Sequence, residues 1–172
     1  MRQGTTIFAR GTKRRAMAIA PSSPINKHLP APLRIGEPFI DKEHDELVAQ
    51  FDRLLSHPDA LPYSETFSEV LSQLGCQIGE HFTHEEVFFT AIGMPENEIQ
   101  HHVQTHTDIL DQYTQLLFDL MNGKAPGRTD VLRLIEDWIV GHVVRFDLNI
   151  KNYLAKADPL TTEAIDRVTL PH

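Results

Sequence analysis

Residues 64–93 read SETFSEVLSQLGCQIGEHFTHEEVFFTAIG, and the spacing of their apolar side chains indicates a long amphipathic helix. Apolar residues recur here three and four positions apart, which places them on one face of an α-helix. These residues are Phe67, Val70, Leu71, Leu74, Ile78, Phe82 and Phe89. Ser64 is a favourable N-cap, and Gly93 is placed to end the helix. The stretch therefore predicts a helix long enough to cross a domain.

Three other stretches show the same helical spacing of apolar residues. We expect the first helix to begin with Asp41 as its N-cap and to end before Pro58. The third opens at Pro95 and runs to Gly123, and the fourth starts near Thr129. The connecting loops are short, so neighbouring helices should be antiparallel. The sequence therefore predicts an all-α protein, an up-down-up-down antiparallel four-helix bundle, and no alternating pattern supports a β domain.

The chain divides into an arm, a folded body and a tail. We expect residues 1–33 to form an extended, disordered N-terminal arm, residues 34–155 to form the bundle, and residues 156–172 to form a C-terminal tail. The first 30 residues hold six basic and no acidic residues, so the remaining 142 carry a formal net charge of −14 within a total of −8. Such an acidic body argues against a nucleic-acid partner. No apolar run approaches the roughly 20 residues that span a bilayer, so no membrane partner is expected either.

Histidine is abundant and cysteine is nearly absent, with 10 histidines and one cysteine among 172 residues. The single cysteine, Cys76, can form neither an internal disulfide nor a thiolate zinc site, which is typical of a protein from a reducing compartment. We therefore expect a cytoplasmic protein in which any bound metal is held by imidazole and carboxylate groups.

Two pairs of side chains have the spacing of metal ligands. His81 and Glu85 are four residues apart on the predicted second helix, and His102 and His106 are four apart on the third. Each pair projects from adjacent turns of one helical face, and both faces carry the apolar core residues. Because buried imidazole and carboxylate groups are costly unless they are satisfied, a metal ion bound between them is the favoured explanation.

The other two helices carry further candidates. His44 lies on the apolar side of the first helix, and His142 is four residues after Trp138 on the fourth. Asp147 follows His142 by five residues, about 140° around an ideal helix, so both reach one site only if the helix is locally distorted. A lone inward histidine is more often a hydrogen-bonded core residue, but five of them with two carboxylates favour a metal. Residue type alone leaves iron, copper, nickel and zinc open.

The remaining histidines fall outside this pattern. We interpret them as solvated or as part of the tails; they are His28, His57, His84, His101 and His172. His84 and Glu86 flank the candidate ligands and are candidates for orienting them.

Four motifs resemble those of the hemerythrin family, specifically its single-domain bacterial members, the bacteriohemerythrins. They are IDKEH ending at His44, HFTHEE at 81–86, HVQTH at 102–106 and WIVGHVVRFD at 138–147. The resemblance covers roughly residues 34–154, and the spacing of five between His142 and Asp147 is also that of the family. One departure is Met94, where members commonly have tyrosine; we expect it to remove no ligand.

The resemblance implies a non-haem di-iron centre inside the bundle, with two iron ions joined by an oxygen-atom bridge. By match, one iron is bound by His102, His106 and His142. The other is bound by His44 and His81, while Glu85 and Asp147 bridge the two. The iron with two histidines keeps an open position for dioxygen. Phe82 and Ile139 are our candidates for the apolar wall of that oxygen pocket, although both also fit as plain core residues.

The implied function is reversible dioxygen binding for carriage, storage or delivery, without enzymatic turnover. The di-iron oxidases of ferritin-like bundles use four carboxylates and two histidines. The site predicted here is richer in histidine and poorer in carboxylate, which favours reversible binding. The alternatives are an enzyme that reduces oxygen or peroxide or oxidises ferrous iron or nitric oxide, and a sensor that acts through a separate partner.

Overall fold

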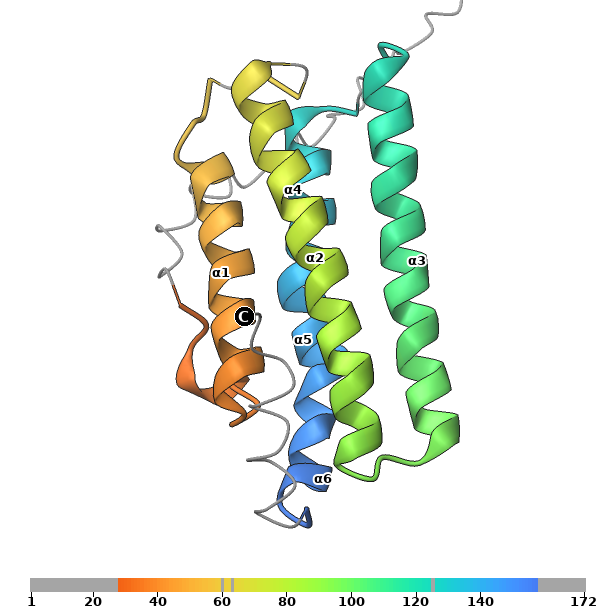
Figure 1. The fold of residues 1–172 in the computed structure, drawn as a ribbon. Helices are drawn as coiled ribbons and strands as arrows, with labels where there is room; N and C mark the ends of the chain where they lie inside the picture. Colours follow the sequence, from red (N-terminus) through yellow and green to blue (C-terminus); the bar gives the residue numbers. More distant parts are fainter. Residues whose placement is uncertain (1–27, 60, 63, 125, 158–172) are drawn as a thin grey trace, which may run out of the picture.

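The chain folds into an antiparallel four-helix bundle, as predicted. The computed structural model describes residues 28–59, 61–62, 64–124 and 126–157. Three long helices, α1 (Pro38–Leu55), α2 (Glu65–Ala91) and α3 (Glu96–Met121), run beside a fourth segment (Figure 1). That segment consists of α4 (Arg128–Glu136), the π-helix η2 (Asp137–Gly141), α5 (His142–Arg145), the 3-10 helix η3 (Asp147–Ile150) and α6 (Lys151–Leu154). The described residues contain no strand, and none of their helices is long and apolar enough to cross a membrane.

The expected arm and tail lie mostly outside the described residues. Within the described part, the 3-10 helix η1 (Ala31–Leu33) precedes α1. Leu29 is buried, and its backbone N–H donates to Asp45 Oδ1 at 2.8 Å. Packing therefore begins before residue 34, where we expected the folded body to start, because an apolar side chain ahead of η1 covers the first helix.

The first helix begins four residues earlier than an N-cap at Asp41 would allow. Glu37 is the N-cap, and its carboxylate accepts the N–H of Ile40 at 2.6 Å, while Pro38 occupies the first turn. The Asp41 carboxylate instead accepts the backbone N–H groups of Ile35 and Gly36, at 2.8 and 3.0 Å. Asp41 therefore holds the segment that enters the helix, and the prediction that it caps the helix is wrong.

The ends of α2 and α3 follow the predicted signals closely. Ser64 caps α2 by accepting the N–H of Phe67 at 3.3 Å. Gly93 and Gly123 follow α2 and α3 with φ angles of 71° and 68°, a left-handed conformation that glycine adopts without strain. Pro95 is the N-cap of α3 and not its first residue, so α3 begins one residue later than expected.

The fourth segment is irregular where it passes the centre of the bundle. The π-helix η2 interrupts it, and Phe146 then leaves the helical region with φ −124° and ψ −59° before the 3-10 helix η3 begins. Because π and 3-10 turns change the number of residues per turn, they rotate the side chains that follow. The break at Phe146 lies between His142 and Asp147, and it is the local distortion that Asp147 requires to share a site with His142.

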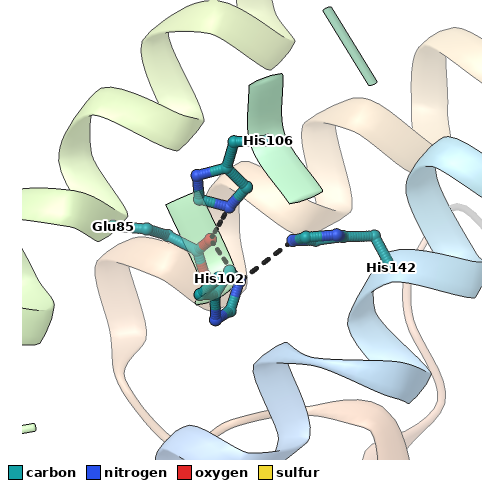
Figure 2. Close-up of side chains that lie close together, drawn as sticks. All are labelled: Glu85, His102, His106 and His142. Carbon is teal, nitrogen blue, oxygen red and sulfur yellow. Dashed lines mark hydrogen bonds and ion pairs between the residues drawn. The ribbon is translucent and has the colours of Figure 1, made fainter. Parts of the chain in front are cut away.

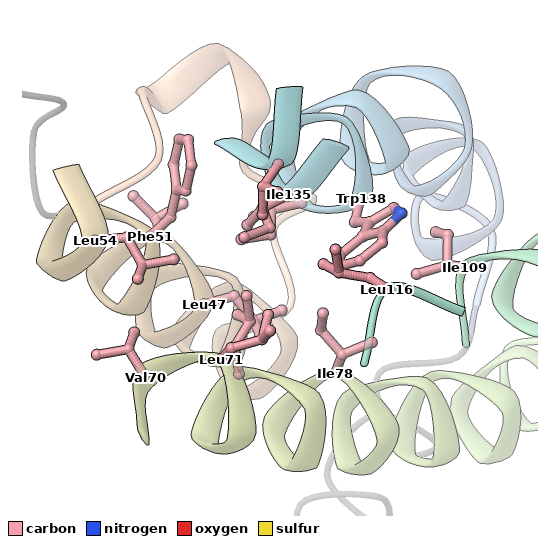
Figure 3. Packing of buried hydrophobic residues seen from close by; sticks show 14 of the residues in the cluster. Leu47, Phe51, Leu54, Val70, Leu71, Ile78, Ile109, Leu116, Ile135 and Trp138 are labelled. Carbon is pink, nitrogen blue, oxygen red and sulfur yellow. The ribbon is translucent and has the colours of Figure 1, made fainter. Parts of the chain in front are cut away.

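Two hydrophobic clusters form the core, one on each side of a polar layer. The larger cluster (Figure 3) includes Phe51, Leu71 and Trp138, and the smaller one includes Ile40 and Phe89. Along each helix, the buried histidines and carboxylates lie between residues of the larger cluster and residues of the smaller one. The polar layer is thus closed off from solvent at both ends.

Candidate metal centre

The structure brings all seven predicted ligand residues together in the polar layer. Each has at most 3% of its surface exposed. They come from four parts of the bundle and are His44 on α1, His81 and Glu85 on α2, His102 and His106 on α3, and His142 and Asp147 on the fourth segment. Regular helical geometry positions the two pairs on α2 and α3, and the irregular turns around Phe146 position the last two.

Three histidines and one carboxylate form the first of two ligand clusters. Glu85, His102, His106 and His142 each offer an atom within 4.8 Å of the others. Glu85 Oε2 lies 3.3 Å from His106 Nε2 and 3.8 Å from His102 Nε2, and the Nε2 atoms of His102 and His142 are 3.1 Å apart (Figure 2). These four residues surround a position that one cation can occupy.

The second cluster has two histidines and two carboxylates. His44, His81, Glu85 and Asp147 offer atoms with the same mutual proximity. His44 Nε2 is 3.2 Å from Asp147 Oδ2, and His81 Nε2 is 3.7 Å from Glu85 Oε2. Glu85 therefore belongs to both clusters.

Asp147 also links the two clusters. Its Oδ1 lies 3.0 Å from the Nε2 atoms of both His102 and His142, while its Oδ2 faces His44. The grouping of three and two histidines that share two carboxylates is the one that the family resemblance implies. The assignment of these residues as metal ligands stays a prediction.

The buried polar atoms of this layer fit a pair of cations. Both oxygens of Glu85 and of Asp147, and the Nε2 atoms of His44 and His106, are buried without a hydrogen bond of good geometry. Burying a neutral polar group without a hydrogen-bond partner costs on the order of 1–3 kcal/mol, and burying an unpaired charge costs more. Five imidazoles and two carboxylates aimed at one another are stabilised if cations accept their lone pairs.

Burial also keeps the imidazoles in the form that binds metals. It lowers the pKa of His81 to about 4 and that of His106 to about 2, and it lowers the pKa of His102 as well. Neutral imidazole has a free lone pair for a metal, whereas imidazolium has none. At neutral pH these side chains are therefore ready to coordinate.

The pKa values of the two carboxylates shift in opposite directions. Burial raises the pKa of Glu85, and the negative charge of Asp147 adds to this. Burial also acts to raise the pKa of Asp147, but the imidazoles of His142, His102 and His44, whose Nε2 atoms lie 3.0 to 3.2 Å from its oxygens, hold it well below its usual range. In the metal-free protein, Asp147 is thus the carboxylate that stays ionised.

Two carboxylates outside the ligand set orient the imidazoles. Glu43 lies 3.1 Å from His81 Nδ1 and 2.6 Å from His84 Nδ1, and Glu86 lies 3.2 Å from His106 Nδ1. A carboxylate that accepts the Nδ1 proton of an imidazole leaves Nε2 as the coordinating atom. The role that we expected of Glu86 therefore has a contact to support it.

Sequence reasoning missed Glu43. The one indication in the sequence is that Glu43 is adjacent to the candidate ligand His44. Its two contacts, however, lie on another helix, and Glu43 itself is partly buried on α1. The pKa of Glu43 is lowered because its pairing with His81 and His84 outweighs the opposing effect of burial. His84 is correspondingly not a solvated residue as we expected, because it is 32% exposed and packs edge-on against Phe39.

The other histidines outside the ligand set lie at the surface. His28, His57 and His101 are exposed, in line with the interpretation from sequence, whereas His172 lies outside the described residues. His28 nevertheless has a partner, since its Nδ1 is 3.0 Å from Asp45 Oδ2.

An aromatic ring covers the three-histidine cluster. Phe82 is 4% exposed and stacks on His106 with ring centroids 3.8 Å apart and an interplanar angle of 6°. Its centroid is 5.4 Å from that of His142. Ile139 is buried in the same hydrophobic cluster as Phe82. The positions of both agree with an apolar wall, but their role in an oxygen pocket stays a prediction. Met94 is buried in the smaller cluster and takes the place of no ligand.

Comparisons with known proteins agree with this geometry. The family profile described as hemerythrin HHE cation binding domain matches residues 36–154, which include every candidate ligand. Comparisons with curated proteins and with solved structures gave no match. Because the profile covers most of the chain and all four helical segments of the bundle, the chain belongs to the hemerythrin HHE cation binding domain family.

Proposed function

We propose that this protein holds two iron ions in its polar layer and binds dioxygen reversibly there. The observation that supports this most strongly is the pair of adjoining clusters, with three and two histidines, that share Glu85 and Asp147. The donor set also fits other imidazole-binding metals. Iron is proposed because the chain belongs to a cation-binding hemerythrin family.

The residues of the layer would hold the two ions. Glu85 and Asp147 have contacts in both clusters, so each would be shared between the two metal positions. Glu43 and Glu86 fix the ring orientation of His81 and His106. When bound, ferrous iron supplies the electrons and the open coordination position that dioxygen binding requires.

The surroundings of the site favour binding over further reduction. Reduction of dioxygen to peroxide or water consumes protons, so a reversible site must withhold them. Phe82 and Ile139 supply apolar surface, and neither has a group that donates a proton. We therefore propose a binding protein and not an enzyme.

The decisive test is a cycle of oxygenation. The protein is loaded with ferrous iron under anaerobic conditions, exposed to oxygen and then deoxygenated, while visible absorption is recorded over several cycles. An absorption band that appears with oxygen and disappears on deoxygenation supports the proposal. Conversion to the ferric protein on first exposure, without a reversible band, refutes it, and sustained oxygen consumption favours the enzymatic alternative.

A matched pair of variants on one helix tests the metal centre itself. Glu85→Ala removes a carboxylate that belongs to both clusters, so iron content measured by metal analysis should fall well below that of the wild-type protein. Glu80→Ala removes an exposed carboxylate of the same helix and should leave iron content unchanged. Wild-type protein that binds zinc and takes up no iron would contradict the di-iron centre.

A further inference from the structure

Two hollows flank the place where α3 passes the fourth segment. The larger one, of about 610 Å³, is lined by residues that include Glu98, His101 and Asn149, and it reaches His102. The smaller one, of about 230 Å³, reaches His142 from the other side. Both hollows thus end on a histidine of the three-histidine cluster. At this seam between α3 and α5, two candidate ligands, His102 and His142, therefore line the hollows directly.

Phe146 and Arg145 line both hollows. The ring centroid of Phe146 lies 5.2 Å from that of His142 and 5.8 Å from those of His101 and His102. Its backbone is at the break between α5 and η3, outside the helical region. The ring therefore lies against the imidazoles of His102 and His142 from a position where the helix changes type: the Phe146 N–H donates to the carbonyl of His142 at 2.9 Å, and its carbonyl accepts the N–H of Asn149 at 3.0 Å in a 3-10 turn.

The charge of the larger hollow suits a cation. Glu98 contributes a carboxylate, which accepts a hydrogen bond from Asn149 Nδ2 at 3.2 Å, and His101 contributes an exposed imidazole. Arg145 also lines the hollow, but its guanidinium forms a bidentate pair with Asp137, at 2.8 and 3.0 Å, which offsets its charge. Oxygen and imidazole donors with no unpaired cation attract a divalent metal ion and not an anion.

We propose that the seam between α3 and α5 is the route by which divalent metal ions enter and leave the centre, and that the Phe146 ring closes it. Glu98 and His101 provide the first donors for an incoming ion, and displacement of the Phe146 ring then exposes His102 and His142. The inference rests on the presence of a metal centre and not on dioxygen binding, so it stands even if the oxygenation test fails.

Metal exchange kinetics test the closing role of Phe146. Uptake of Co²⁺ by metal-free protein is followed by stopped-flow absorption, and its release is followed with an excess of chelator. A side chain that only closes a route changes the barrier for both directions equally. Phe146→Ala should therefore speed uptake and release by the same factor, about tenfold if its ring contacts dominate the barrier, and leave the affinity unchanged.

Two further variants make this result decisive. Phe118→Ala, which removes an exposed phenylalanine of α3, should leave both rates unchanged. Phe146→Leu keeps an apolar side chain at the break, so it should fold even if the alanine variant does not, and it should accelerate both rates by a smaller factor. Faster release with unchanged uptake would show that the mutation merely weakens the centre, and that result overturns the proposal, as does an absence of change in both rates.

A charge-matched pair tests the cation route. Glu98→Gln should slow Co²⁺ uptake about threefold at low salt, and the difference should vanish near about 1 M salt, where charges are screened. Glu136→Gln removes the same charge from an exposed position on α4, away from the hollow, and should not slow uptake. Equal slowing by both variants, or slowing by neither, would overturn the assignment of Glu98 to the route.

Discussion

The close contact between α2 and α3 at Gly75 is expected to control the stability of the bundle. A Cβ atom at Gly75 would lie 2.7 Å from Cε1 of Tyr113 and closer still to Cζ and Oη. The Tyr113 hydroxyl also donates to the carbonyl of Leu71 at 3.3 Å, so the ring cannot move without losing that bond. Gly79, one turn further along α2, has nothing within 4 Å of the same position.

The two glycines therefore respond to alanine in opposite ways. Overpacking costs about 1–3 kcal/mol, loss of the hydrogen bond costs about 1 kcal/mol, and the helix preference of alanine over glycine returns about 1 kcal/mol. Gly75→Ala should thus lower the free energy of unfolding by about 1–3 kcal/mol, while Gly79→Ala should raise it by about 1 kcal/mol. The expected difference between the two variants is about 2–4 kcal/mol.

Urea unfolding of the metal-free variants, followed by circular dichroism, measures this difference. Removing the ring should relieve the clash, so Gly75→Ala combined with Tyr113→Leu should be more stable than the sum of the two single changes predicts. Equal unfolding midpoints for Gly75→Ala and Gly79→Ala would refute the reasoning, because the close approach of Tyr113 would then not affect the free energy of unfolding.

Three further predictions concern the metal centre. Glu43→Gln weakens the acceptor for the Nδ1 protons of His81 and His84 and should lower metal affinity about 10- to 100-fold in chelator competition, whereas Glu46→Gln, on the exposed side of the same helix, should not. Asp147→Asn should reduce the amount of metal bound per chain without loss of helical circular dichroism. The control Asp111→Asn changes an exposed residue of α3 and should bind as much metal as the wild-type protein. Full metal content in Asp147→Asn would contradict the linking role of Asp147. In the metal-free protein, burial lowers the pKa of His81 from its ordinary 6.5 to about 4 in the folded state. As the pH falls from 6.5 toward 4, the unfolded chain therefore takes up a proton at this residue before the folded chain does, and the folded state loses stability. Wild type should therefore lose stability relative to His81→Gln over that interval in urea unfolding, and a constant difference between them would be inconsistent with the low pKa.

Much of the site was predictable because its geometry is local. Residues four apart on a helix always face the same side, so the pairs His81 with Glu85 and His102 with His106 follow from spacing alone. Their position among apolar residues of the same stripe showed that they face the core. The helix ends at Ser64 and Gly93 were predictable for the same reason, since capping depends on a few adjacent residues.

The contacts of Glu43 were not predictable in this way. Glu43 meets His81 and His84 across the interface between α1 and α2, and these residues are 38 and 41 positions away in the sequence. Whether they meet depends on how the two helices are rotated and offset. That relation is set by the packing of their apolar faces, which the local pattern of either helix does not contain.

The sequence by itself determined the helical periodicity, the helix ends near glycines and the two ligand pairs, because each depends on residues within one or two turns. Only the tertiary structure decided the position of Asp147. On an ideal helix it would point about 140° away from His142, yet the chain leaves the helical region at Phe146 and a 3-10 helix begins at Asp147, which brings its carboxylate between both ligand clusters. Its contacts with His44 and His102 lie on other helices, so the position of its carboxylate is a property of the assembled bundle.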